Sequence, residues 1–331
     1  MAGLLIERIR TNPQWRTFSG RAFLENLVSI SWGWAVLALA AIYTTYLVRA
    51  LRWRLLMRPV KRTARLWTIF SATVIGFAAI GIFGRPGEMV RPYLVARKEG
   101  VPVSSQMAVW VLERCFDTLT VLVIVAFALS DLEAAGLRSS PTLIRALSVG
   151  GSVVAFAALG IVILLVGMRN YADQTAGWVL ERLRFLPPAR YQWVEHGTQS
   201  FLQGSRGVRS LGALGVCSLY SAAQWGLIAF CYAAVFNSFS GGMRLSVSET
   251  LIFMGCVMAG SFIQVPGLGG GIQVASVLVL TELFAVKPEA AASISLLIWI
   301  YTFLVVVPPA AGLAFYEGWS WSKLWRLEAE S

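Results

Sequence analysis

The sequence predicts an all-α integral membrane protein with about five full transmembrane helices and two opposed re-entrant helical hairpins, arranged as an inverted repeat. Three observations carry this prediction: an apolar composition, apolar runs of spanning length, and two interruptions rich in glycine and proline. Of the 331 residues, 57% are hydrophobic and 14% are charged, and the mean hydropathy is +0.67. A soluble chain of this length does not need so many apolar residues for its core.

Five apolar runs reach about 18 residues or more, the length that crosses a bilayer as a helix. They cover residues 33–50, 107–129, 147–166, 211–236 and 291–315. Two further runs are shorter or end in glycine and proline, so neither is a clean span. We expect these two runs to begin the re-entrant hairpins, at residues 67–98 and 250–285.

Basic residues orient these segments in the membrane. The densest basic group follows the first span and contains Arg52, Arg54, Arg58, Lys61, Arg62 and Arg65. The positive-inside rule places this loop in the cytoplasm, together with the basic segment 169–209. Segment 67–98 must then enter and leave on the cytoplasmic side, because a single crossing would put 169–209 outside. Counting the membrane crossings along the chain in the same way makes 250–285 a hairpin that enters from the external side. The count also places the C-terminus in the cytoplasm.

The two hairpins also align with each other in sequence. When the sequence is aligned with a shifted copy of itself, Gly84 pairs with Gly267 and Gly87 pairs with Gly270. Together with the opposite orientations, this alignment indicates an inverted-topology repeat. The predicted units are an N-terminal amphipathic interfacial segment (1–32), a first repeat with its connecting span (33–167), a basic cytoplasmic amphipathic segment (168–209), a second repeat (210–315) and a cytoplasmic tail (316–331).

Composition and motifs argue against several classes of function. The formal net charge is +11, but the basic residues flank apolar runs, where orientation and anionic lipid headgroups account for them better than nucleic acid does. The four cysteines lack a CxxC spacing, and the single histidine has no His or Cys nearby. No nucleotide-binding motif is present. We therefore expect no nucleic-acid partner, no metal and no cofactor.

The tip of the first hairpin reads GRPGE at residues 84–88 and is followed by Arg91. Glycine and proline break the helix and free backbone N–H groups, which bind anions such as phosphate. Arg85 and Arg91 add guanidinium groups that suit phosphate oxygens. Gly87 and Glu88 complete this candidate site, and Glu88 is expected to pair with Arg85, Arg91 or Arg114. The alternative is an ordinary basic loop with a glycine turn.

Three ionisable residues lie inside the apolar run 107–129. Glu113 and Asp117 are four residues apart and therefore share one helix face, with Arg114 beside them. A charge within a span is normally paired or functional. One hypothesis is that Arg114 completes the anion site of Arg85 and Arg91, while the two carboxylates position the arginines or exchange protons. The alternative is a structural ion-pair cluster that holds this helix to the hairpin.

The second hairpin offers an uncharged candidate site. Its tip, residues 266–271, reads PGLGGG, so backbone groups and side-chain amides would have to bind the ligand. The alternative is a role in helix packing, because small residues permit close contact. The candidate residues are Gln264, Pro266, Gly267, Gly269, Gly270 and Gln273.

Four motifs together resemble a known family: LRWRLL at 51–56, GRPGE at 84–88 with Arg91, ERCFD at 113–117, and PGLGG at 266–270. The chain resembles the lysylphosphatidylglycerol synthase transmembrane region family, also called flippase-like domain proteins, over residues 48–313. This family is related to the lipid-translocating half of the multiple peptide resistance factor. The resemblance implies a multi-pass protein of a bacterial or archaeal cytoplasmic membrane that moves, or helps to move, a lipid.

The leading hypothesis is therefore a lipid flippase or facilitator for an anionic phospholipid or polyprenyl-phosphate lipid, without enzymatic activity. One alternative is a membrane-embedded transferase or phosphatase that acts on a lipid headgroup, with Glu88 or Asp117 as base or metal ligand. Another is a non-transporting partner that recruits a cytoplasmic lipid-modifying enzyme through segment 169–209.

Overall fold

The computed structural model describes residues 18–134, 141–239, 245–260, 264–265 and 269–317. These residues form helices and one short pair of strands. In chain order the elements are α3 (Gly20–Val28), α4 (Trp32–Leu56), α5 (Leu66–Phe83), η1 (Arg85–Met89), α6 (Val90–Glu99), α7 (Val103–Ala134), α8 (Pro141–Asn170), α9 (Ala172–Arg182), α10 (Pro188–Ser205), η2 (Arg206–Val208), α11 (Leu211–Ser238), α12 (Val247–Gly260), β1 (Gln264–Val265), β2 (Gly269–Gly270), α13 (Gly271–Glu282), α14 (Pro288–Thr302), η3 (Leu304–Val306) and α15 (Val307–Tyr316).

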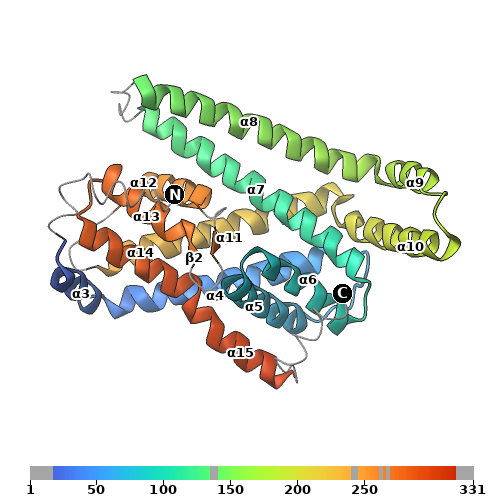
Figure 1. The fold of residues 1–331 in the computed structure, drawn as a ribbon, viewed down its shortest axis with the longest axis horizontal. Helices are drawn as coiled ribbons and strands as arrows, with labels where there is room; N and C mark the ends of the chain where they lie inside the picture. The colour runs from blue at the N-terminus through green and yellow to red at the C-terminus, as the bar shows by residue number, and fades with distance from the viewer. Residues whose placement is uncertain (1–17, 135–140, 240–244, 261–263, 266–268, 318–331) are drawn as a thin grey trace.

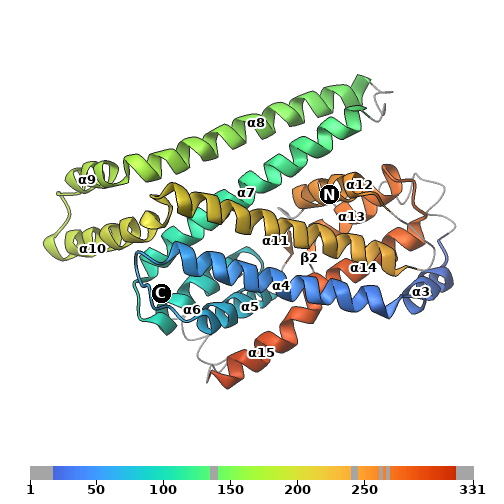
Figure 2. The same ribbon diagram turned by 180° about the vertical axis from the view of Figure 1, so that it is seen from behind.

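Two long helices, α4 and α11, lie side by side along the long axis of the bundle (Figures 1 and 2). At one end lie α3 and the start of α14, and we call this the α3 end. At the other lie α9, α10 and the end of α6, together with the loop at residues 57–65, and we call this the basic end (Figure 1). Helices α7 and α8 run along one side, with α8 outermost.

Among the residues that the structure describes, four helical segments are long and apolar enough to cross a membrane: Trp32–Leu56, Leu66–Phe83, Leu211–Ser238 and Pro288–Tyr316. The bent pair Ala155–Asn170 and Ala172–Arg182 makes a fifth if it counts as one broken span. An all-helical protein with several candidate spans is therefore confirmed. Two details differ from expectation. Helix α5 reaches spanning length by itself, and α7 is not among the candidates, because three charged residues, Glu113, Arg114 and Asp117, lie within its described part.

Apolar side chains lie exposed on α8 between residues 155 and 170, the part of this helix whose side chains are described, as expected for a helix that faces lipid. Phe156, Leu159 and Ile163 are exposed by 74%, 55% and 61%, and their spacing puts them on one helix face. A contiguous apolar surface of this kind is rare on soluble monomers, and it marks a contact with lipid or with protein.

The first predicted hairpin is present as three helical pieces. After α5 the chain turns through η1, and α6 packs back along α5. The turn depends on Gly87, because a Cβ atom at this position would lie 2.4 Å from the carbonyl oxygen of Ala79. The hairpin also returns to the basic end, where Lys61 Nζ lies 2.9 Å from Glu99 Oε2 and Lys98 Nζ donates a hydrogen bond to Ser71 Oγ at 3.0 Å.

The second hairpin consists of α12 and α13, joined through an antiparallel strand pair with Gln264 opposite Gly270 and Val265 opposite Gly269. It starts and ends toward the α3 end, while β2 lies near the middle of the bundle (Figure 1). The two hairpins therefore point in opposite directions along the long axis. Their re-entry into a membrane and their relation as an inverted repeat stay predictions.

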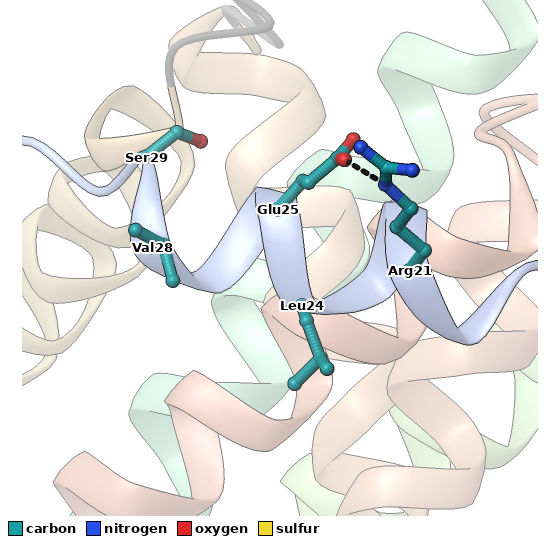
Figure 3. A pocket seen from close by; sticks show the side chains of 5 residues that line it. All are labelled: Arg21, Leu24, Glu25, Val28 and Ser29. Carbon is teal, nitrogen blue, oxygen red and sulfur yellow. Dashed lines mark hydrogen bonds and ion pairs between the residues drawn. The ribbon is translucent and has the colours of Figure 1, made fainter.

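Helix α3 is the described part of the predicted interfacial segment 1–32. It has no buried residue, and it is attached to α14 by hydrogen bonds from Ser19 N–H to Glu289 Oε1 (3.0 Å) and from Ser293 Oγ to the Phe23 carbonyl (3.2 Å). Figure 3 shows a hollow on this helix, where Arg21 pairs with Glu25 at 2.9 Å while Leu24 and Val28 lie exposed. Residues 1–17 lie outside the described part of the chain.

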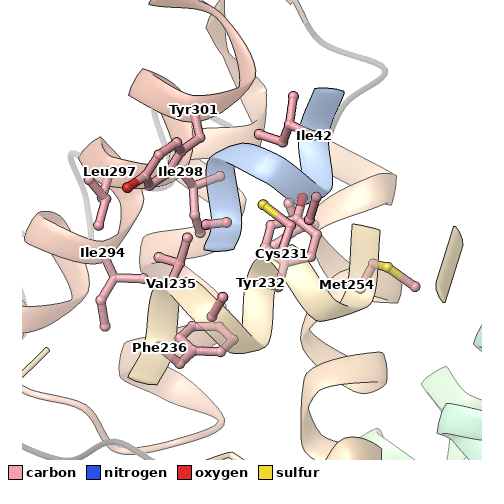
Figure 4. Packing of buried hydrophobic residues seen from close by; sticks show 14 of the residues in the cluster. Ile42, Cys231, Tyr232, Val235, Phe236, Met254, Ile294, Leu297, Ile298 and Tyr301 are labelled. Carbon is pink, nitrogen blue, oxygen red and sulfur yellow. The ribbon is translucent and has the colours of Figure 1, made fainter. Parts of the chain in front are cut away.

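Two clusters of buried hydrophobic residues hold the bundle together. The larger joins α4, α11, α12 and α14, with Phe236 and Tyr232 near Met254 and Ile294 (Figure 4). The smaller lies toward the basic end and joins α4, α5, α6 and α7 through Trp53, Leu56, Ile69, Leu94 and Leu112, among others. Buried charged residues of three of these helices, α4, α6 and α7, lie beside this smaller cluster.

Candidate functional site

Helix α4 contributes two arginines to the interior of the bundle. Arg49 and Arg52 are three residues apart and so share one face, and they are exposed by only 7% and 0%. The prediction that Arg52 and Arg54 belong to a loop after the first span is wrong, because α4 continues to Leu56. Arg52 stays helical and buried because carboxylates of another helix meet its guanidinium group.

Helix α7 supplies these carboxylates. Arg52 bridges them, with Nη2 2.8 Å from Glu113 Oε1 and Nη1 2.7 Å from Asp117 Oδ1. Arg49 Nη1 lies 3.2 Å from Asp117 Oδ2 and 3.8 Å from Glu113 Oε1. Glu113 and Asp117 are exposed by 1% and 5%. The i, i+4 spacing therefore places both acids on one buried face, as the sequence predicts.

Helix α6 brings Arg91 from the first hairpin into the same group. Its Nη1 lies 2.8 Å from Glu113 Oε2, and its Nη2 donates a hydrogen bond to the Arg49 carbonyl at 3.2 Å. The guanidinium carbon also lies 4.1 Å from the ring centroid of Trp53, a cation–π contact. Arg91 thus connects the hairpin to both α4 and α7.

Helix α11 completes the group with two uncharged polar side chains. Gln224 Nε2 donates a hydrogen bond to Asp117 Oδ1 at 3.2 Å, and Arg52 Nη1 donates one to Ser221 Oγ. We call Arg49, Arg52, Arg91, Glu113, Asp117, Ser221 and Gln224 the arginine–carboxylate cluster. It joins α4 and α11 to the consecutive helices α6 and α7.

The arginine–carboxylate cluster has unused hydrogen-bonding capacity. Within the described part of the chain, the buried atoms Arg52 Nε, Arg91 Nε and Gln224 Oε1 have no hydrogen-bond partner. Leaving such groups unsatisfied costs free energy. The two Nε–H groups are donors, which an added anionic oxygen would satisfy.

The cluster also carries excess positive charge. Three buried arginines face two buried carboxylates, so one positive charge is left over. Arg114 adds another: its Nη2 lies 3.3 Å from Asp117 Oδ2, and its side chain is 40% exposed. Arg114 therefore places a cation at the open edge of the cluster. Charge in the interior of a membrane protein is expensive and normally marks a functional site or a paired cluster.

Comparison with protein-family models identifies the lysylphosphatidylglycerol synthase TM region, which matches residues 13–310. The chain belongs to this family. Neither a curated protein nor a solved structure gives a significant match. Family membership makes the chain a membrane protein related to lipid modification or transport, and the whole arginine–carboxylate cluster lies within the matched region.

Only some of the residues predicted to bind a ligand at the first hairpin belong to the arginine–carboxylate cluster. Arg91 joins Glu113, Arg114 and Asp117, as described above. Glu88 pairs with Arg85, one of its three expected partners, with Oε1 3.3 Å from Arg85 Nη1. The Arg85 side chain is 51% exposed, and Gly87 is used in packing against α5. A ligand role for Arg85, Gly87 and Glu88 stays a prediction.

The tip of the second hairpin is described only in part. Pro266 and Gly267 lie outside the described residues, as does the side chain of Gln264, whose backbone forms β1. Gly269 and Gly270 form β2. Gln273 Oε1 accepts a hydrogen bond from Gly270 N–H at 2.7 Å, while its buried Nε2 has no partner in the described part of the chain. Gln273 therefore supports the start of α13, and both N–H donors of its Nε2 lack a partner among the described residues.

Sequence reasoning missed four residues of the cluster: Arg49, Arg52, Ser221 and Gln224. A signal was present for the arginines, since they are three residues apart at the end of an apolar run. Their partners on α7 are more than sixty residues away, as the separations of 68 and 61 for the Arg49–Asp117 and Arg52–Glu113 pairs show. The sequence alone does not reveal this pairing. In the described part of the chain, no group of three or more His, Cys, Asp or Glu residues is placed to hold a metal ion.

Proposed function

We propose that this family member moves, or helps to move, an anionic phospholipid or polyprenyl-phosphate lipid across a bacterial or archaeal cytoplasmic membrane. The observation that carries the proposal is the arginine–carboxylate cluster: a buried group with excess positive charge and unused donors, in a bundle of apolar helices. A lipid phosphate would supply the missing negative charge and accept hydrogen bonds from those donors.

The exposed side of Arg114 is the proposed point of approach. Its guanidinium group is the most accessible cation next to the cluster, and it already contacts Asp117. A phosphate that binds there would be drawn toward Arg91 and Arg49, while the acyl chains stay in lipid beside the apolar helix surfaces. The two acids keep the arginines apart and oriented when no lipid is bound.

The hairpins supply the proposed movement. In this proposal the first hairpin re-enters from the basic end, which the positive-inside rule places in the cytoplasm, and the second re-enters from the other side. Arg91 belongs to the first hairpin and pairs with Glu113 of α7. A phosphate that replaces Glu113 as the partner of Arg91 would loosen this contact, so lipid binding and hairpin displacement would be coupled.

Lipid movement in proteoliposomes tests the proposal. We expect the double variant Arg91→Gln, Arg114→Gln to reduce translocation of a fluorescent phosphatidylglycerol at least about tenfold, because each change removes a charge-assisted contact with phosphate. The control is Arg182→Gln, which removes a cation that stacks on Trp178 away from the cluster. Unchanged translocation by a correctly folded double variant would overturn the proposal.

The same preparation separates the alternatives. Lipid extracts are analysed for chemically altered headgroups, since an altered headgroup without movement would indicate an enzyme. Soluble proteins that co-purify are identified before and after deletion of residues 169–209. A lipid-modifying enzyme lost on deletion, without lipid movement, would indicate a recruiting partner instead.

A further inference from the structure

A hollow at the basic end, separate from the arginine–carboxylate cluster, is lined by Arg58, Pro59, Arg62 and Arg206. Two of these arginines lie in the loop after α4, and the third lies on η2, so the fold brings together residues far apart in sequence. The hollow has a volume of about 660 Å³ and is open to the surface. The lining contains no acidic residue.

The wall of this hollow is held firmly in place. At Gly207 a Cβ atom would lie 2.3 Å from the carbonyl oxygen of Leu56, so η2 packs directly on the end of α4. Val208 beside it is fully buried. Gln203 Nε2 donates a hydrogen bond to the Pro59 carbonyl at 3.4 Å, which ties α10 to the loop. Arg206 is therefore fixed next to Arg58 and Arg62 by backbone packing.

The charges of the hollow are largely unneutralised. Among the residues that the structure describes, no carboxylate lies within ion-pair distance of Arg58 or Arg62. Arg206 pairs with Asp173 at 3.5 Å, and this carboxylate is shared with Arg209. Orientation by the positive-inside rule accounts for basic residues at this end, but not for a concave surface that gathers three of them.

We propose that this hollow binds a phosphate-bearing anion, independently of the lipid movement proposed above. Arginine forks bind phosphate oxygens through paired hydrogen bonds. The hollow lies where the apolar helix α4 ends, and the end of a membrane-spanning helix is the level expected for lipid headgroups. A lipid headgroup and a soluble phosphate share this chemistry, and the experiment distinguishes them.

The test compares two variants of the full chain in detergent that lose the same charge. The site variant is Arg58→Gln, Arg62→Gln, Arg206→Gln. The control is Arg54→Gln, Arg65→Gln, Arg97→Gln, which removes exposed arginines of the same end that do not line the hollow. Native mass spectrometry measures binding of phosphatidylglycerol and phosphatidylcholine, and calorimetry measures binding of glycerol 3-phosphate. Thermal unfolding confirms that each variant is folded.

We expect the site variant to bind phosphatidylglycerol at least about tenfold more weakly than the wild type, and the control to change by about twofold or less. If only glycerol 3-phosphate binding falls, the anion is soluble rather than a lipid headgroup, and the site still stands. The proposal would be overturned if the site variant and the control lost phosphatidylglycerol and glycerol 3-phosphate binding equally, or if neither variant lost any binding. Translocation of the fluorescent phosphatidylglycerol by the site variant should stay within about twofold of the wild-type value, so failure of lipid translocation and failure of this site are distinguishable.

Discussion

Arg91 and Glu113 form a buried ion pair between the first hairpin and α7, with Nη1 2.8 Å from Oε2. Glu113 also accepts a hydrogen bond from Arg52 at 2.8 Å. The Glu113 carboxylate therefore binds both Arg91 of the first hairpin and Arg52 of α4. This relationship makes the hairpin's position depend on the charge of a single side chain on another helix.

Glu113→Gln is expected to destabilise the protein more than Arg91→Gln does. Loss of the carboxylate leaves Arg52 and Arg91 facing each other with one acid fewer, and breaking a buried pair costs about 3 to 5 kcal/mol. Loss of Arg91 leaves Glu113 paired with Arg52. The measurement is thermal unfolding of the purified full chain in detergent, and equal effects of the two changes would contradict this ranking.

Arg52→Lys is expected to destabilise the protein by about 1 to 3 kcal/mol although the charge is kept. A single ammonium group cannot bridge Glu113 and Asp117 and also reach Ser221 with the geometry of a guanidinium fork. Arg54→Lys on the exposed side of the same helix is the matched control and should be neutral. Thermal unfolding measures both, and a neutral Arg52→Lys would argue against the bridging role.

Gly87→Ala is expected to displace η1 from α5, because the added Cβ would lie 2.4 Å from the Ala79 carbonyl oxygen. Overpacking of this kind costs about 1 to 3 kcal/mol. Gly160→Ala is the control, since its Cβ would meet nothing within 4 Å and alanine favours a helix. Limited proteolysis and thermal unfolding report the effect, and equal stability of the two variants would count against the close packing.

Labelling with a membrane-impermeant maleimide tests whether the hairpins re-enter. In a Cys256→Ser background, cysteines at Thr63 and Arg97 bracket the first hairpin, and cysteines at Val247 and Lys287 bracket the second. We expect the first two to react from one side of the membrane and the last two from the other. Reaction of Thr63→Cys and Arg97→Cys from opposite sides would show that this segment crosses the membrane once.

Much of the candidate site is visible in local sequence signals. Glu113 and Asp117 stand out because charge inside an apolar run is costly, and their helical spacing puts them on one face. Gly84 and Gly87 mark a turn because glycine and proline end a helix. These inferences succeed because they depend on neighbouring residues and on the solvent that surrounds a helix.

The partners of these residues are set by contacts between distant helices. Arg52 is expected in a basic loop and Arg49 lies within an apolar run, yet both pair with Asp117 of α7. Arg85 pairs with Glu88 at the hairpin tip instead of joining Arg91. Arg206 meets Arg58 and Arg62 only because Gly207 lets η2 touch the end of α4. The sequence by itself determined the helices, the membrane character and the two breaks, since hydropathy and glycine act locally. Only the tertiary structure decided which charges neutralise one another, because a long arginine side chain pairs with whichever carboxylate the packing of the helices brings within reach.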